Sequence, residues 1–234
     1  MYGRLPGMLL LSMVSIPYGM LGAEAPEMQA GEAITLIRNA RHNRTEGYFY
    51  RAEAQYRRAL AILEQTSGAG SADLTPALNG LAELYFDAQR YSEAEALAQR
   101  SAAVVEANLG AGHPLLATAL QDLAAIYHVQ GQYAKAEPLY YRALAIREQA
   151  LGPSHPFVAS TLADLAEMES ARGRYDRAAE HYARAVRIRQ DAFGMDDPRV
   201  AETLSSYAAV LRKSCHKRDA ASVEARSRAI LAAR

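Results

Sequence analysis

Apolar side chains recur along almost the whole chain with the spacing of one helix face. In the middle of the sequence, Leu120, Leu123, Ala124 and Tyr127 stand at positions i, i+3, i+4 and i+7, which places them on one stripe of an α-helix. A second helical stretch begins near Tyr133. No segment shows the alternation of apolar and polar residues that is typical of a half-buried strand. The pattern therefore predicts an all-α chain.

The same pair of helical stretches returns every 42 residues. When the chain is shifted against itself by this distance, it matches without a gap from about Ala33 to the C-terminus, and five columns match in all five copies. These columns are Leu36, Leu78, Leu120, Leu162 and Leu204; Ala40, Ala82, Ala124, Ala166 and Ala208; Ala52, Ala94, Ala136, Ala178 and Ala220; Arg58, Arg100, Arg142, Arg184 and Arg226; and Ile62, Val104, Ile146, Ile188 and Ile230. A fixed period of this length indicates a repeat protein. We predict five helix-turn-helix units, at residues 33–74, 75–116, 117–158, 159–200 and 201–234.

Turn residues mark the helix ends within each unit. One column of glycines suits the left-handed residue that ends the first helix of a unit; in two units this position holds Gln89 or Cys215 instead. A second column of glycines ends the second helix of a unit. The glycines are Gly47, Gly131 and Gly173 in the first column, and Gly68, Gly110, Gly152 and Gly194 in the second. Proline then suits the first position of the next helix, and the residue before it can cap that helix. These pairs are His113-Pro114, His155-Pro156 and Asp197-Pro198.

These motifs resemble the tetratricopeptide repeat. The family pattern L-x-x-L-A-x-x-Y followed by G-x-Y-x-x-A-E is present at residues 120–127 and 131–137. The long period and the R-A-L-x-I-R-E motif at residues 142–148, followed by L-G and H-P, resemble the kinesin light chain subfamily. The resemblance implies a right-handed α-solenoid over residues 33–234, with the first helix of each unit lining a concave surface. It also implies that the concave groove binds a peptide or protein partner.

The resemblance further implies which residues lie on or near the concave side. Counted from the leucine of each first helix, the candidates are Arg38, Arg41, Arg44, Asn79, Glu83, Phe86, Asp87, Gln121, Asp122, His128, Asp164, Glu167, Arg212 and Lys213. Their charges predict an acidic middle with basic ends. We therefore expect the partner segment to carry Arg or Lys near its centre, with Phe86 offering an apolar or cation–π contact.

The N-terminus has the pattern of a secretory signal peptide at residues 1–23. Arg4 precedes an uncharged apolar stretch at residues 7–21, and small residues follow; this order is typical of such signals. The stretch is short for a membrane span, which needs about 20 residues. Cleavage is expected after Ala23, although cleavage after Ala25 also fits the A-x-A pattern. Residues 24–32 are expected to be a linker. An uncleaved anchor or a start placed too early are the alternatives.

Composition narrows the remaining classes of function. The 26 basic and 26 acidic residues balance, so the basic excess usual in nucleic-acid binders is missing. One cysteine excludes a disulfide framework within the chain and a zinc site built on several thiolates.

Candidate catalytic and metal-binding residues have structural explanations. His113 and His155 lie one repeat apart, too far to share a metal ion, so capping is favoured. Cys215 and His216 are adjacent and therefore point in different directions on a helix. Asp122 and Asp164, with Glu83 and Glu167, recur with the repeat, which favours a solvated groove surface over acid–base catalysis. The tyrosines Tyr85, Tyr91, Tyr127, Tyr133 and Tyr175 are expected to pack in the core.

The chain ends in a basic helix. Residues 212–234 hold seven basic side chains against two acidic ones. The polar outer face of a terminal capping helix explains them better than a patch for an anionic surface.

Two classes of function remain. The first is an exported scaffold, periplasmic or secreted, that binds a peptide or protein partner; the alternative is an intracellular, cytoplasmic adaptor or regulator. An enzyme would need a catalytic domain, and no phosphate loop, His-Glu-x-x-His helix or nucleophile elbow occurs. We expect no cofactor, no metal and no nucleic acid as partner, and membrane contact only if the N-terminal segment stays uncleaved.

Overall fold

The structure is a computed structural model that describes residues 26–214 and 216–233. Within these residues it contains ten α-helices, one short 3-10 helix and no strand. The helices are α1 (Pro26–Thr45), α2 (Phe49–Ser67), η1 (Ala72–Leu74), α3 (Thr75–Asp87), α4 (Tyr91–Leu109), α5 (Pro114–Val129), α6 (Tyr133–Leu151), α7 (Pro156–Ala171), α8 (Tyr175–Phe193), α9 (Pro198–Lys213) and α10 (Lys217–Ala232). They form five successive helix-turn-helix pairs, so the predicted all-α solenoid is confirmed.

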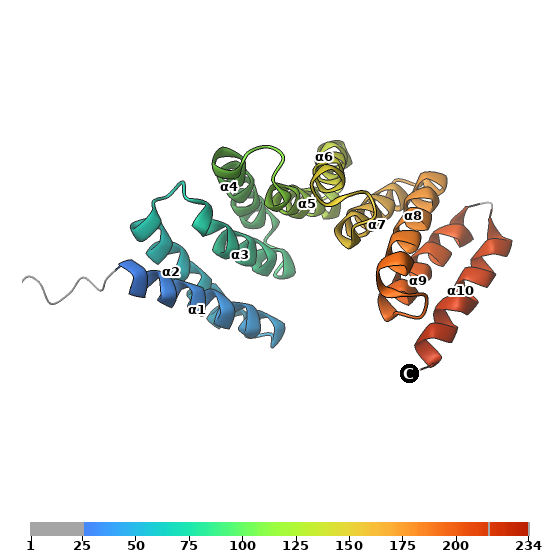
Figure 1. Ribbon diagram of the computed structural model, residues 1–234, viewed down its shortest axis with the longest axis horizontal. Coiled ribbons are helices and arrows are strands. Elements are labelled where there is room, and N and C mark those ends of the chain that lie inside the picture. The colour runs from blue at the N-terminus through green and yellow to red at the C-terminus, as the bar shows by residue number, and fades with distance from the viewer. Residues whose placement is uncertain (1–25, 215, 234) are drawn as a thin grey trace, which may run out of the picture.

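The helix pairs stack into an arch. Figure 1 shows α1 and α2 at one end and α9 and α10 at the other, with α3, α5 and α7 on the inner side of the arch. Each helix contacts its sequence neighbours, and α1, α3, α5 and α7 also contact one another in succession. Because each unit packs against the next, α1, α3, α5 and α7 form one continuous concave face.

The first helix begins earlier than the sequence predicted. Residues 26–32, expected to belong to a linker, form the first turns of α1. Pro26 suits the first helical position, the next residues are mostly strong helix formers, and Ala33 and Ile37 are buried farther along the same helix. The predicted signal peptide lies outside the described residues. Across 26–214 and 216–233, every helix is too short or too polar to cross a bilayer.

The two alanine columns of the repeat lie at tight helix contacts. In the first column, Ala40, Ala82, Ala124, Ala166 and Ala208 are at most 3% exposed; in the second, Ala52, Ala94, Ala136, Ala178 and Ala220 are at most 2% exposed. A methyl side chain lets two helix backbones approach closely, whereas a larger group would hold them apart. The period of these columns thus sets the stacking of the units.

The turn within each unit uses one residue in the left-handed conformation. Gly131 has φ 73°, and the amide of Gln132 donates to the carbonyl of Tyr127 at 2.8 Å, which closes the end of the helix. Gln89 adopts φ 59° at the equivalent position although it carries a side chain. The turn geometry is therefore fixed by the packing of the two helices and not by glycine alone.

Side chains cap the inner helices as the sequence predicted. The Nδ1 atoms of His113 and His155 accept from the second amide of the following helix at 3.2 Å each. Asp197 Oδ1 accepts from the Arg199 amide at 2.9 Å. Each proline occupies the first helical turn. Capping thus explains both histidines, and the described residues contain no group of three or more side chains arranged to hold a metal ion.

The arginine column ties successive units together on the outer side. Its three central members pair with a glutamate 36 residues earlier, on the second helix of the preceding unit. These pairs are Arg100–Glu64 at 2.6 Å, Arg142–Glu106 at 2.5 Å and Arg184–Glu148 at 2.6 Å. Exposed pairs of this kind contribute at most about 1 kcal/mol each, so they fix the register between units more than they stabilise the fold.

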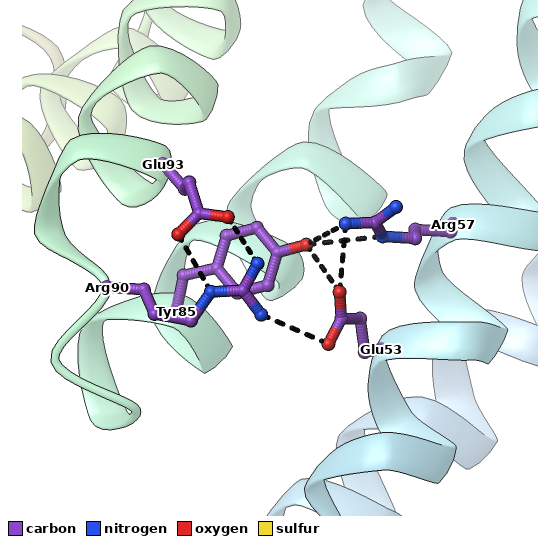
Figure 2. A network of polar contacts seen from close by, with 5 residues as sticks. All are labelled: Glu53, Arg57, Tyr85, Arg90 and Glu93. Atoms are coloured by element: carbon purple, nitrogen blue, oxygen red, sulfur yellow. Dashed lines mark hydrogen bonds and ion pairs between the residues drawn. The ribbon is translucent and has the colours of Figure 1, made fainter.

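A second polar network joins units through a buried tyrosine (Figure 2). The Tyr85 hydroxyl donates to Glu53 at 2.7 Å and accepts from Arg57 at 2.7 Å, both on α2. The Arg90 guanidinium lies 4.0 Å from the centre of the Tyr85 ring and pairs with Glu53 and Glu93. Tyr127, at the equivalent position of the next unit, likewise donates to Glu95 of the preceding unit at 2.8 Å. Tyr85 and Tyr127 are buried in the core, as predicted, whereas Tyr91, Tyr133 and Tyr175 are partly buried and pack against it.

Candidate functional site

The concave face holds a cavity where α1, α3 and α5 meet. Its volume is about 160 Å³, and it is lined by Arg44, Ala82, Glu83, Phe86, Asp87, Asp122, Ala125 and Ile126. Five of these are predicted groove residues. The sequence did not predict the other three lining residues, Ala82, Ala125 and Ile126, although Ala125 stands at the same repeat position as the predicted groove residues Glu83 and Glu167.

Arg44 closes one side of the cavity. It lies near the end of α1, and its guanidinium pairs with Glu83 and, at 3.4 Å, with Asp87. The two carboxylates lie one turn apart on α3 and therefore share one face of that helix. The sequence predicted Arg44 to belong to a basic end of the groove, but the fold brings it among the carboxylates of the middle.

Phe86 supplies the apolar wall of the cavity. Its ring is half-buried and packs edge-on against Tyr91, with the ring centres 5.7 Å apart. This contact orients the Phe86 ring on α3. In the sequence, Phe86 lies between the two acidic residues Glu83 and Asp87. The cavity thus combines an aromatic surface with a negative rim.

Asp122 lies deeper than the solvated carboxylate that the sequence predicted. Its Oδ2 atom is buried and makes no hydrogen bond to any described residue. Burial first, and then the negative charge of Glu83, raise the pKa of the Asp122 carboxyl from 3.8 to about 7, against the opposing effect of Arg147. The cause is the loss of hydration of the ionised form. The wall of the cavity therefore includes a residue with a buried acceptor that no described side chain satisfies.

A buried arginine on α6 supports the floor of the concave face. Arg147 is 5% exposed and donates to the side chains of Gln121 and Thr161 and to the Phe157 carbonyl. Gln121 in turn donates to Asp164. The pKa of the Asp164 carboxyl is raised to about 7, mainly by burial, while the hydrogen bond from Gln121 is the largest effect that lowers it. Gln121 and Asp164 thus belong to one network.

The sequence analysis missed Arg147, although the repeat carries a signal for it. Positions 63, 105, 147 and 189 are equivalent and hold Leu, Val, Arg and Arg. The residue fourteen places later is Ala after the apolar residues and Thr after the arginines. Arg189 reaches Thr203 in the same way that Arg147 reaches Thr161. A comparison of the units position by position would have paired these residues.

A second acidic region lies between α7, α8 and α9. Asp164 and Glu167 line a cavity of about 240 Å³ together with Arg189 and Glu202. Glu167 and Lys213 line a neighbouring cavity of about 380 Å³. Burial raises the pKa of Glu167. The predicted acidic middle is therefore divided, with Asp122 facing the first region and Asp164 the second.

The remaining predicted groove residues lie outside these cavities. Arg38 and Arg41 are exposed on α1, and Arg212 pairs with Glu224 at 2.9 Å. Asn79 accepts from Ser101 at 2.5 Å, so it joins two helices of one unit. The His128 ring packs at a tilt against the Tyr133 ring, with the ring centres 5.9 Å apart, and burial lowers the pKa of His128. Cys215, which the sequence gave no reason to treat as catalytic together with His216, lies outside the described residues.

Comparison with known proteins gives the following matches. The profile of the tetratricopeptide repeat matches residues 73–149, 117–191 and 164–233. No curated protein sequence matches the chain significantly.

Three solved structures have the same fold. BtubC (BKLC) from P. vanneervenii is 24% identical with TM-score 0.74, covering 90% of this chain and 92% of that one. A putative kinesin light chain from Podosopora anserina with nearly identical TPR-like repeats is 22% identical with TM-score 0.76, covering 90% and 98%. MamA is 17% identical with TM-score 0.55, covering 86% and 92%.

Proposed function

The chain belongs to the tetratricopeptide repeat family, and from this premise we propose that it is a scaffold that binds a peptide segment of a protein partner along its concave face. Proteins of this repeat family generally bind other proteins, and the solenoid offers an extended inner face for such binding. The observation on which the proposal rests is the cavity between α1, α3 and α5, which combines Phe86 with the acidic Glu83, Asp87 and Asp122.

The charges of this face favour a partner segment with Arg or Lys near its centre. Three carboxylates and one arginine line the first cavity, and the second region holds Asp164, Glu167 and Glu202 against Arg189. A central acidic residue of a partner would meet like charge in a confined space, which costs binding energy. A basic residue would meet opposite charge, and Phe86 offers it a ring face or edge.

A binding experiment with matched peptide libraries tests this proposal. The two libraries differ only in a central Arg and Lys or Asp and Glu, and affinities are measured by fluorescence anisotropy at low and moderate salt. We expect the basic peptides to bind more tightly and to lose affinity as salt screens the charges. Equal affinity for both libraries would contradict the assignment of the groove.

A pair of charge reversals provides the control for the peptide experiment. Asp122→Lys combined with Asp164→Lys should abolish or invert the preference for basic peptides. Asp176→Lys combined with Asp191→Lys changes the net charge equally on exposed positions of α8, and it should leave the preference unchanged. An unchanged preference in the first double variant would show that binding occurs elsewhere.

We also propose that the scaffold is exported, to the periplasm or beyond. The support is the order of charge, apolar stretch and small residues at residues 1–23. Cell fractionation with N-terminal sequencing of the mature protein tests this proposal. An exported chain should begin at Glu24, after cleavage following Ala23, or at Pro26, after cleavage following Ala25. An intact Met1 in the cytoplasmic fraction would favour the intracellular adaptor instead.

A further inference from the structure

The cavity between α1, α3 and α5 already contains a guanidinium group of the chain itself. Arg44 lines the cavity and pairs with Glu83 and Asp87, which are about half exposed at its rim. Planar guanidinium groups match carboxylates in geometry better than ammonium groups do. The rim of the cavity is therefore built to hold a guanidinium, and α1 supplies one in the unbound chain.

The deeper acceptor of the same cavity has no such partner. The buried Oδ2 of Asp122 makes no hydrogen bond within the described residues, and Arg44 makes its ion pairs with Glu83 and Asp87. Arg147 approaches from the other side but donates to Gln121, Thr161 and the Phe157 carbonyl. A buried carboxylate oxygen without a donor is unfavourable, so a donor that entered the cavity would be stabilised there.

The charges around Asp122 come from four neighbouring helices. Glu83 on α3 and Asp164 on α7 repel a second negative charge, whereas Arg147 on α6 and Arg44 on α1 attract it. With three carboxylates lining the cavity and Arg44 as its one lining cation, the fully ionised cavity has a net charge of −2. The side chain of one entering cation would change the net charge of the cavity from −2 to −1.

From these observations we infer that the cavity is the subsite for one arginine side chain of the partner, with Asp122 as its acceptor, and that Arg44 competes with this side chain for Glu83 and Asp87. The inference rests on the proposed function, which it deepens by naming a side chain and a competing residue. The volume of about 160 Å³ exceeds that of several waters, whose share of liquid volume is about 30 Å³ each. Phe86 contacts the aliphatic stem or the guanidinium face of the entering side chain.

The first experiment uses the tightest-binding peptide of the basic library that has arginine at its centre. Its central arginine is replaced by citrulline, a neutral group of nearly the same shape, and both peptides are titrated against the full chain. We expect Asp122→Asn to weaken the arginine peptide about tenfold or more, because a hydrogen bond to a charged group is lost. The citrulline peptide should bind the native chain and the variant equally. Equal binding of the arginine peptide to both proteins would overturn the subsite while leaving the library preference intact.

Arg44→Gln tests the role of the competing residue. Removing the competing positive charge should tighten the arginine peptide by a few-fold, and more at low salt than at high salt. Arg142→Gln is the matched control, since this arginine also pairs with a carboxylate, Glu106, but on the outer side; it should change nothing. Weaker binding by Arg44→Gln would show that Arg44 contacts the partner directly, and would overturn its role as competitor.

A small probe tests the subsite independently of any peptide. Ethylguanidinium, with ethylurea as the neutral control, is titrated into the labelled full chain while amide chemical shifts are recorded. Shifts at Phe86, Asp122 and Ala125 with ethylguanidinium alone are expected, and they should be absent in Asp122→Asn. If no library peptide binds but these shifts occur, the proposed function fails and the subsite stands. If the shifts are absent from the native chain, the subsite is overturned.

Discussion

The carboxyl group of Asp122 should make the unbound chain less stable as the pH rises. Its pKa is about 7 in the folded chain because of burial, whereas an unfolded aspartate has a pKa near 4. Between these two values the folded chain keeps a proton that the unfolded chain has lost, so the free energy of unfolding falls with rising pH. Asp122→Asn removes the ionisation and should remove this loss of stability.

The size of the effect follows from the shift in pKa. A shift of about three units at 1.36 kcal/mol per unit gives about 4 kcal/mol for a fully buried, independent group. The Asp122 side chain keeps part of its exposure and interacts with Asp164, so we expect about 2 kcal/mol at pH 8. For a chain of this length, this corresponds to a rise of about 4–8 °C in the midpoint of thermal unfolding.

Thermal unfolding followed by circular dichroism at pH 5 and pH 8 measures the effect. Asp122→Asn should unfold several degrees above the native chain at pH 8, and the difference should shrink to about a third of that value at pH 5, which is only about one unit above the unfolded pKa. Asp191→Asn, which removes an exposed carboxylate of α8, is the control and should show no such pH dependence. An Asn variant that is less stable at pH 8, or equally shifted at both pH values, would refute the burial of this carboxyl group.

Three further predictions concern the packing of the repeat. Arg147→Val should destabilise the chain because Gln121 and Asp164 lose their support, and adding Thr161→Ala, which recreates the apolar pair of the preceding units, should recover part of the loss. Urea unfolding of the two single variants and the double variant should give a coupling energy of about 0.5–3 kcal/mol. Full additivity of the two effects would contradict the pairing. Ala124→Phe and Ala166→Phe should each cost about 1–3 kcal/mol by overpacking, and unchanged urea midpoints would contradict the close helix contact. Gln89→Gly should stabilise the turn by about 1 kcal/mol, because a side chain at φ 59° is strained; a lower urea midpoint would contradict this.

The period of the sequence determined the architecture. A repeat protein places the same contacts at the same positions in each unit. A column of alanine or leucine therefore predicts a buried position in each of the five units. The helix ends followed from local chemistry, since capping and left-handed turns depend on a few neighbouring residues. These features need no knowledge of distant contacts, which is why helices, turns and caps agree with the structure.

The start of the first helix shows where the period stops being informative. Residues 26–32 precede the first matching column, so the self-comparison of the chain assigned them to a linker. Their helical propensity and the buried Ala33 and Ile37 extend α1 through them instead. Local propensity was the better guide at the edge of the repeat.

The site depended on the tertiary structure. The sequence alone gave the candidate positions on the concave side, but it could not predict that Arg44 of the first unit would reach Glu83 and Asp87 of the second. Nor could it predict that Asp122 would lose its hydration while Arg212 stayed exposed. Burial and pairing of charges depend on how neighbouring units stack, because the field at one side chain is the sum of groups brought close from several helices. The sequence therefore determined the scaffold, and the stacking of the units decided which charges are paired, which are buried, and where a cation can enter.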